Sequence, residues 1–314
     1  MSAAPADALF EPRIDARRRR SRLFAGACVA VAAFTMTVLA VLLIDIAHDG
    51  WPYLTRSFLT RYPSVLDPKS GGMLSGIAGS IWIVGLTALL AVPIGVGAAV
   101  WLEEYAPQNR LTRFIRLNIA NLAGVPSIVY GILGLAIFVR WLHLGRSVAA
   151  GALTMTLLVL PVVIIASREA LAAVPSSIRQ AAYALGATRW QTVRSHVLPA
   201  ALPGIMTGVI LSLSRAIGET APLIMLGALT YVAFVPGGAL SDYPSGAGGL
   251  LEWTQTALTD QFTAMPIQVF NWTSQPQKDF HDLAAAGIMA LLGALLTMNA
   301  VAIGIRAWSQ RTRT

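Results

Sequence analysis

Residues 179–199 read RQAAYALGATRWQTVRSHVLP and lie between two long apolar runs. They belong to a polar segment, 168–199, in a chain that is otherwise mostly apolar. Residues 176–185 favour a short helix, and Gly186 suits the left-handed position that ends one. Pro199 then begins the next apolar run, at a helix start where a missing N–H costs little. The stretch predicts a helix, a glycine turn and a second helix start. It either docks a partner or lies on the lipid as an amphipathic connector.

The composition is that of an integral membrane protein. Of the 314 residues, 55% are hydrophobic and only 12% are charged, whereas soluble domains carry about 25% charged residues. The net charge of +8 comes almost wholly from arginine. These arginines gather at the ends of apolar runs, so membrane orientation explains them better than nucleic-acid binding does, and we expect no nucleic-acid partner.

Six segments are apolar and long enough to cross a bilayer, which takes about 20 residues. We therefore predict an all-α, polytopic membrane protein. The predicted spans are 23–47, 74–102, 117–142, 148–166, 202–234 and 283–305. The predicted divisions are an N-terminal tail 1–22, a transmembrane domain 23–305 that includes the loop 168–199, and a C-terminal tail 306–314.

The positive charges predict which side each loop faces. Sixteen of the 23 lysines and arginines lie in segments 1–22, 110–116, 168–199 and 306–314. Six lie on the other side, five of them in the alternate loops and Arg140 near the outer end of the third span, and Arg215 lies inside the fifth span. The positive-inside rule then puts both termini and the 168–199 loop in the cytoplasm. The first apolar run exceeds the 7–15 residues of a signal peptide, so we expect an uncleaved first span.

The polar loop resembles the coupling motif of ATP-binding-cassette (ABC) importer permeases, which runs Glu-Ala-Ala, three residues, Gly, nine residues, Ile, any residue, Leu-Pro. The residues that match in spacing are Gln180, Ala181, Ala182, Gly186, Leu198 and Pro199, preceded by Arg179. Gln180 stands where the motif has glutamate, and His196 where it has isoleucine. The resemblance implies that these residues couple the chain to a separate ATPase.

Further segments resemble the PstA-type phosphate permeases, from about residue 70 onward. They are VWLEEYA at 100–106, NLAGVPSIVYG at 121–131, AIGETAPL at 216–223, the stretch 262–271, and HDLA at 281–284. PstC-type permeases share Gly-Glu-Thr but typically not the Ala-Pro-Leu that follows it here.

The resemblance implies a MetI-like type I importer fold and a permease subunit in the bacterial plasma membrane. It implies four partners besides membrane lipid: a second, PstC-like permease, two copies of a cytoplasmic PstB-like ATPase, and an external PstS-like phosphate-binding protein. The chain lacks the Gly-x-x-x-x-Gly-Lys-Ser/Thr phosphate loop of ATPases. We therefore expect a transport subunit and not an enzyme, with no cofactor of its own and ATP–Mg held by the ATPase.

Arg215 and Glu219 are the candidate substrate-path residues within a span. Their i, i+4 spacing predicts one shared helix face, and charges inside a membrane usually face a bundle interior or a watery cavity. Arg215 would attract a passing phosphate, Glu219 would balance it, and Thr220 would add a hydroxyl. The alternative is a structural ion pair between spans.

Other polar residues lie in the spans or at their ends. Asn121 and Ser127 flank the Gly-Val-Pro break, where they either line the path or satisfy backbone groups freed by the proline. Glu103 and Glu104 end the second span, and we interpret them as a solvated helix end because adjacent helix residues point about 100° apart. Asn299 is expected to make an interhelical hydrogen bond.

Two other functions stay open on the sequence alone. One is a permease for another oxyanion, sulfate or molybdate. The other is an ion-coupled carrier that works without an ATPase, which internal inverted repeats would support.

Overall fold

The computed structural model describes residues 14–65, 67–228, 231–244 and 246–311. The described chain is built from helices, with one isolated bridge between Ser147 and Gln261 and no strand, so the all-α prediction is confirmed. The helices are α1 Ile14–Gly50, α2 Arg56–Thr60, α3 Leu74–Val100, α4 Arg110–Ala123, α5 Ser127–Gly134, α6 Val148–Ala172, α7 Ser176–Ala184, α8 Arg189–Thr192, α9 Leu198–Gly218, α10 Ala221–Leu226, α11 Ala247–Thr259, α12 Met265–Thr273 and α13 Lys278–Arg311. Residues 1–13 and 312–314 of the two predicted tails lie outside the described residues.

Five of the described helical segments are long and apolar enough to cross a membrane, and a bent pair makes a sixth. The five are 18–50, 74–105, 148–172, 189–218 and 278–304. Wide π-helical turns continue α3 to Tyr105, continue α5 to Trp141 and join α8 to α9. The structure thus has a helix over each of the first, second, fourth and sixth predicted spans.

The third predicted span, 117–142, is wrong as one continuous helix. It consists of α4 and α5, and the chain bends by 100° between them. Pro126 lacks an N–H and clashes with the preceding turn, so the helix cannot continue through it. The hydroxyl of Tyr130 donates a hydrogen bond of 2.8 Å to the carbonyl of Leu122, to which Pro126 has no N–H to donate and which also accepts from the N–H of Val125 at 3.0 Å.

The fifth predicted span, 202–234, is wrong beyond Gly218. Helix α9 ends there, and Glu219 is extended with ψ 115°. A helical Pro222 would clash with the carbonyl four residues back, which is that of Gly218. Pro222 instead lies in the first turn of α10, where it is tolerated. Gly227, with φ +93°, ends α10 after only six residues.

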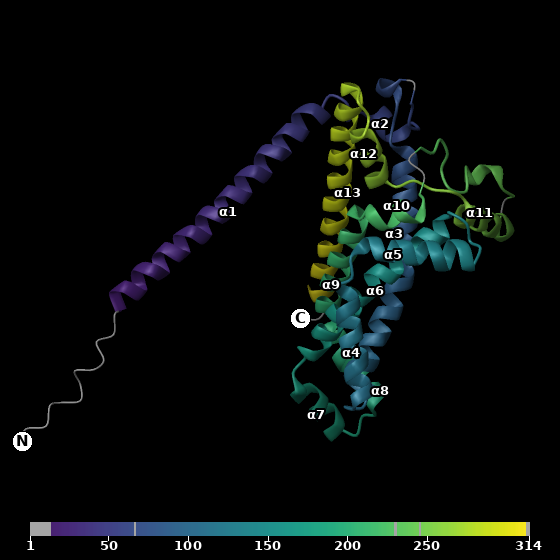
Figure 1. Ribbon diagram of the computed structural model, residues 1–314. Coiled ribbons are helices and arrows are strands. Elements are labelled where there is room, and N and C mark those ends of the chain that lie inside the picture. The colour runs from purple at the N-terminus through teal and green to yellow at the C-terminus, as the bar shows by residue number, and fades with distance from the viewer. Residues whose placement is uncertain (1–13, 66, 229–230, 245, 312–314) are drawn as a thin grey trace, which may run out of the picture.

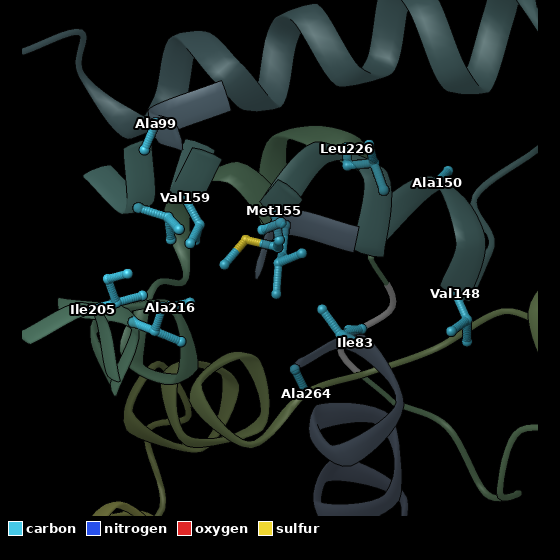
Figure 2. Close-up of a cluster of buried hydrophobic side chains, with 14 of the residues drawn as sticks. Ile83, Ala99, Val148, Ala150, Met155, Val159, Ile205, Ala216, Leu226 and Ala264 are labelled. Carbon is cyan, nitrogen blue, oxygen red and sulfur yellow. The ribbon is translucent and has the colours of Figure 1, made fainter. Parts of the chain in front are cut away.

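The core lies where α3, α6 and α9 pack side by side (Figure 1). Figure 2 shows Ile83, Met155, Val159 and Ile205 turned toward one another in this cluster. Small residues let these helices approach closely, which is the usual way that helices associate in lipid. At Gly208, for example, an added Cβ would lie 2.4 Å from the side chain of Ala166.

Helices α5 and α10 run across the long helices (Figure 1) and pack against each other. At their crossing, a Cβ added to Gly131 would lie 2.6 Å from the carbonyl oxygen of Pro222 and 2.8 Å from Cβ of Met225. The two broken segments therefore support each other, as broken membrane helices must when no water reaches their backbone.

Two other regions frame this bundle. Helix α1 meets α13 near Gly50 and projects away from the body (Figure 1). Its apolar side chains are exposed. At the same end of the bundle, α12 is buried between α3 and α13, and Gln268 donates a hydrogen bond of 3.1 Å to the carbonyl of Gly72. Helix α11 stands to one side of the bundle (Figure 1).

The α5–α10 crossing generates a stability prediction. Gly131→Ala places a methyl group where Pro222 leaves no room, and overpacking of this kind costs about 1–3 kcal/mol. We expect a lower thermal unfolding midpoint for the purified protein in detergent. Gly97→Ala is the matched control, because that helical glycine has no heavy atom within 4 Å of the added Cβ. An unchanged midpoint for Gly131→Ala would contradict the packing described above.

Candidate functional site

A pocket lies beside the α4–α5 bend, between that bend and helices α6 and α9. The lining residues are Leu122, Ala123, Val125, Ser127, Tyr130, Leu158, Val159, Val162, Ser212 and Arg215. Apolar side chains make most of the wall. The polar side chains are two serines, a tyrosine and one arginine, so the wall carries a single cation and no carboxylate.

Arg215 and Glu219 form the expected ion pair, with 3.2 Å between Nε and Oε1. Glu219 is not on the helix, however, because α9 ends one residue earlier. The Arg215 side chain is 68% exposed and that of Glu219 is 18% exposed. Within the described chain, the hydrogen bond of this guanidinium to Glu219 is made through Nε.

The structure brings together only part of the predicted path. Ser127 and Arg215 line the same pocket. Asn121 is exposed in the last turn of α4, while Glu219 and Thr220 lie just past the end of α9, and none of these three is in the pocket wall.

Three further polar residues complete this picture. Ser212 lines the pocket and donates to the carbonyl of Gly208 at 2.8 Å. Ser214 bonds to Asn299 on α13 at 2.5 Å, so the interhelical role expected for Asn299 is confirmed. Tyr130 is a wall residue that sequence reasoning missed, since only its hydrogen bond across the bend distinguishes it.

The polar loop forms at the opposite end of the bundle from α12 (Figure 1), with the predicted shape. Helix α7 is followed by Gly186 with φ +80°, whose N–H donates to the Tyr183 carbonyl at 2.9 Å. Thr188 and Gln191 then cap the start of α8 reciprocally. The chain runs on through Leu198 into α9.

The residues of the motif divide between two faces of α7. Gln180 and Ala181 are exposed, whereas Ala182 is buried and Arg179 points inward. Three large apolar side chains on this loop are also exposed: Tyr183 at 44%, Leu185 at 89% and Trp190 at 58%. Leu198 and Pro199 are half-buried at the start of α9.

Arg179 is paired with Glu104, at the cytoplasmic end predicted for the second span. The distance from Nη2 to Oε1 is 2.6 Å, and the Glu104 side chain is only 6% exposed. The interpretation of the two glutamates as a solvated helix end is therefore wrong for Glu104. It holds better for Glu103, which is 24% exposed and lies 3.8 Å from Arg116.

The electrostatics of this pair are mutually stabilising. The hydrogen bond to Glu104 raises the pKa of the Arg179 guanidinium above its ordinary value, against the opposite effect of burial. Removing one partner of a buried pair strands the other charge and typically costs about 3–5 kcal/mol. Close by, the Arg189 guanidinium carbon lies 6.0 Å from the ring centroid of Tyr105. The loop thus touches the end of α3 twice.

In the described chain no group of three His, Cys, Asp or Glu residues is placed to hold a metal ion. What the structure does contain is a bundle of membrane-length helices, a pocket with one cation, and an exposed helical loop fixed to the span ends. This combination is typical of the membrane subunit of a transport system, in which a second protein acts on the loop.

The chain belongs to the family of binding-protein-dependent transport system inner membrane components, whose model matches residues 91–313. It is 38% identical over 205 residues to the Probable ABC transporter permease protein YqgI of Bacillus subtilis, covering 65% of this chain and 68% of that protein. It is 30% identical to the phosphate transport system permease protein PstA of Haemophilus influenzae, covering 90% and 92%. It is 36% identical to the phosphate transport system permease protein PstA 1 of Mycobacterium tuberculosis, covering 67% and 69%.

Solved structures agree on the fold. A chain of a bacterial alginate ABC transporter, solved with its alginate-bound periplasmic protein, has a TM-score of 0.60 at 15% identity and covers 94% of this chain and 99% of that chain. A chain of the inward-facing MetNI methionine ABC transporter has a TM-score of 0.53, also at 15% identity, and covers 76% and 95%. The expected MetI-like permease fold is confirmed.

Proposed function

We propose that this chain is the PstA-type permease subunit of an ATP-driven importer of inorganic phosphate. The observation that carries the proposal is the pocket in which Arg215, Ser127 and Ser212 come together among apolar spans. The phosphate permeases among the relatives support the choice of substrate.

The chemistry of the pocket suits a transient anion. A single guanidinium offers several N–H donors to a phosphate, and the Ser127 hydroxyl adds a donor beside it, whereas the Ser212 hydroxyl already donates to the carbonyl of Gly208. An anion path needs a site strong enough to admit the ion yet weak enough to release it. Glu219, at 3.2 Å from Arg215, meets that need by pairing with the cation when no phosphate is present.

The open face of the pocket is where a second subunit belongs. Arg215 is 68% exposed in the isolated chain, although a mid-membrane charge is stable only beside protein or water. We propose that a PstC-like permease covers this face and completes the path. An external PstS-like protein would deliver phosphate to it.

The loop is the proposed entry point for energy from ATP. Two PstB-like ATPase subunits, which hold ATP–Mg, would dock one on each permease. On this chain they would contact the exposed Gln180, Ala181, Tyr183 and Leu185 of α7 and its flank, with Trp190 nearby. Docking would then move the spans and alternate the access of the pocket between the two sides.

This assignment includes an orientation. The loop and both termini would face the cytoplasm of a bacterium, as the arginine-rich segments favour. The tails 1–22 and 306–314 would flank one transmembrane domain, 23–305, with the coupling loop 168–199 inserted in it.

Substitution of Arg215 tests the proposed path. Arg215→Ala removes the only cation in the pocket wall, and a charged hydrogen bond contributes about 1.5–3 kcal/mol. We expect ATP-dependent phosphate uptake by the assembled complex to fall about tenfold or more, with Arg215→Lys intermediate. Arg140→Ala is the control, because this exposed arginine lies at the far end of the α5 segment, outside the pocket wall. Normal uptake by Arg215→Ala at normal abundance would remove Arg215 from the path.

Substitution of Gly186 tests the docking loop. At φ +80° a β-branched residue is strained by about 1–2 kcal/mol, whereas asparagine tolerates that conformation. We expect Gly186→Val to weaken co-purification of the ATPase and to reduce uptake, and Gly186→Asn to preserve both. Equal behaviour of the two variants would mean that the turn geometry does not matter for docking.

A further inference from the structure

Glu104 is a buried carboxylate at the end of a membrane helix. Its side chain is 6% exposed, although it follows the last turn of α3, where the chain leaves the bundle. A carboxylate is buried in its charged form only when it is paired and hydrogen-bonded. Both oxygens of Glu104 accept hydrogen bonds from Arg179, 75 residues along the chain, at 2.6–3.3 Å.

The same guanidinium reaches a third helix. Arg179 Nη1 donates to the carbonyl of Val174 at 2.8 Å, and Nη2 donates to the carbonyl of Leu171 at 3.0 Å. These carbonyls lie in the last turn of α6 and just beyond it, where in-helix donors run out. One planar side chain on α7 therefore joins α7, the end of α3 and the end of α6. Only arginine has a donor fork suited to this arrangement.

This three-way contact adds to the apolar packing of Ile178 and the buried Ala182 in attaching α7 to the bundle. Only residues 173–175 connect α7 to α6 through the chain, and on its other side the turn at Gly186 leads to α8. A short helix held only by its two turns and by two apolar side chains would pivot when pushed. Arg179 and Glu104 fix it against the 27-residue helix α3, which crosses the whole bundle.

We propose that Glu104 is a positioning residue for energy coupling, one that clamps the docking helix α7 to the inner end of α3. When α7 is displaced, α3 and α6 then move with it as one rigid body, and the displacement does not merely bend the loop 168–199. The clamp deepens the proposed function and rests on it, because it has a purpose only if an ATPase pushes on α7.

The neighbouring carboxylate provides the matched control. Glu103 is on the same turn, has the same charge, and lies at the same end of α3. It faces Arg116 of α4 at 3.8 Å. Its charge also acts on Arg179 at longer range, but in the described structure it makes no hydrogen bond or ion pair with that residue. Glu103→Gln therefore removes one negative charge near Arg179 and leaves the hydrogen bonds between Arg179 and Glu104 in place.

The test uses the complete transporter, with both permeases and the ATPase, reconstituted in lipid vesicles with the external binding protein. The measured quantity is phosphate taken up per ATP hydrolysed, at equal amounts of assembled complex. Glu104→Gln keeps the shape of the side chain and loses the charge. We expect its ATP hydrolysis to stay within about twofold of wild type while uptake per ATP falls about tenfold, and we expect Glu103→Gln to match wild type.

A double substitution separates coupling from general destabilisation. If the two side chains act as one clamp, Glu104→Gln with Arg179→Gln lowers uptake per ATP no further than the worse single variant. Fully additive losses would contradict a shared role. Arg179→Lys keeps the charge without the fork, and we expect an intermediate uptake per ATP.

Three results would overturn the proposal. One is a wild-type ratio of uptake to ATP hydrolysis for Glu104→Gln. Another is an equal loss in Glu103→Gln. The third is failure of both Glu104→Gln and Arg179→Lys to assemble with the ATPase, which would make the pair an assembly element. A wild-type complex that hydrolyses ATP without taking up phosphate would contradict the proposed function itself. That result is distinguishable from the three results above, all of which are seen in the variants.

Discussion

Inside a membrane, every backbone N–H and C=O group needs a hydrogen-bond partner, and the rest of this structure depends on that constraint. Two helices break within the bundle, at Gly124–Pro126 and at Glu219–Thr220, and each break is tolerated because another element covers it. Tyr130 bonds across the first break, and the close crossing of α5 and α10 supports both. The first break also creates the pocket, since the turn into α5 brings Ser127 beside α9 and its Arg215. Backbone irregularity and the candidate site are thus one feature.

Much of the fold could be predicted from the sequence, because hydropathy over a 20-residue window reports burial in lipid directly. The bends could not. A proline forbids a straight helix, but the new direction is set by what the next segment packs against, here the contact of Gly131 with Pro222. Glu104 was misinterpreted for a related reason. Its identity and position at a span end suggest solvent, and only the tertiary structure brings Arg179 to within 2.6 Å.

The shape of the loop was predictable because it is local. The conformations of a left-handed glycine and of a capping pair depend on only a few neighbouring residues. Gly186 has the left-handed conformation, and Thr188 and Gln191 form the capping pair. The pocket was predictable only in part. Arg215 was identifiable because it is a charge inside a span. The bend between Asn121 and Ser127 decides that Ser127 lines the pocket and that Asn121 does not.

The loop and the pocket are joined by continuous helices. Arg179 donates hydrogen bonds to the carbonyls of Leu171 and Val174 at the C-terminal end of α6. Nearer the middle of the same helix, Leu158 and Val162 line the pocket. Helix α9 begins beside the loop and carries Arg215 near its other end. Uptake of labelled phosphate and of labelled sulfate, measured in vesicles that carry the assembled complex with ATP inside, tests the account most directly. It predicts ATP-dependent phosphate uptake that excess sulfate does not reduce. Sulfate uptake at an equal rate, or phosphate uptake without the ATPase, would contradict it.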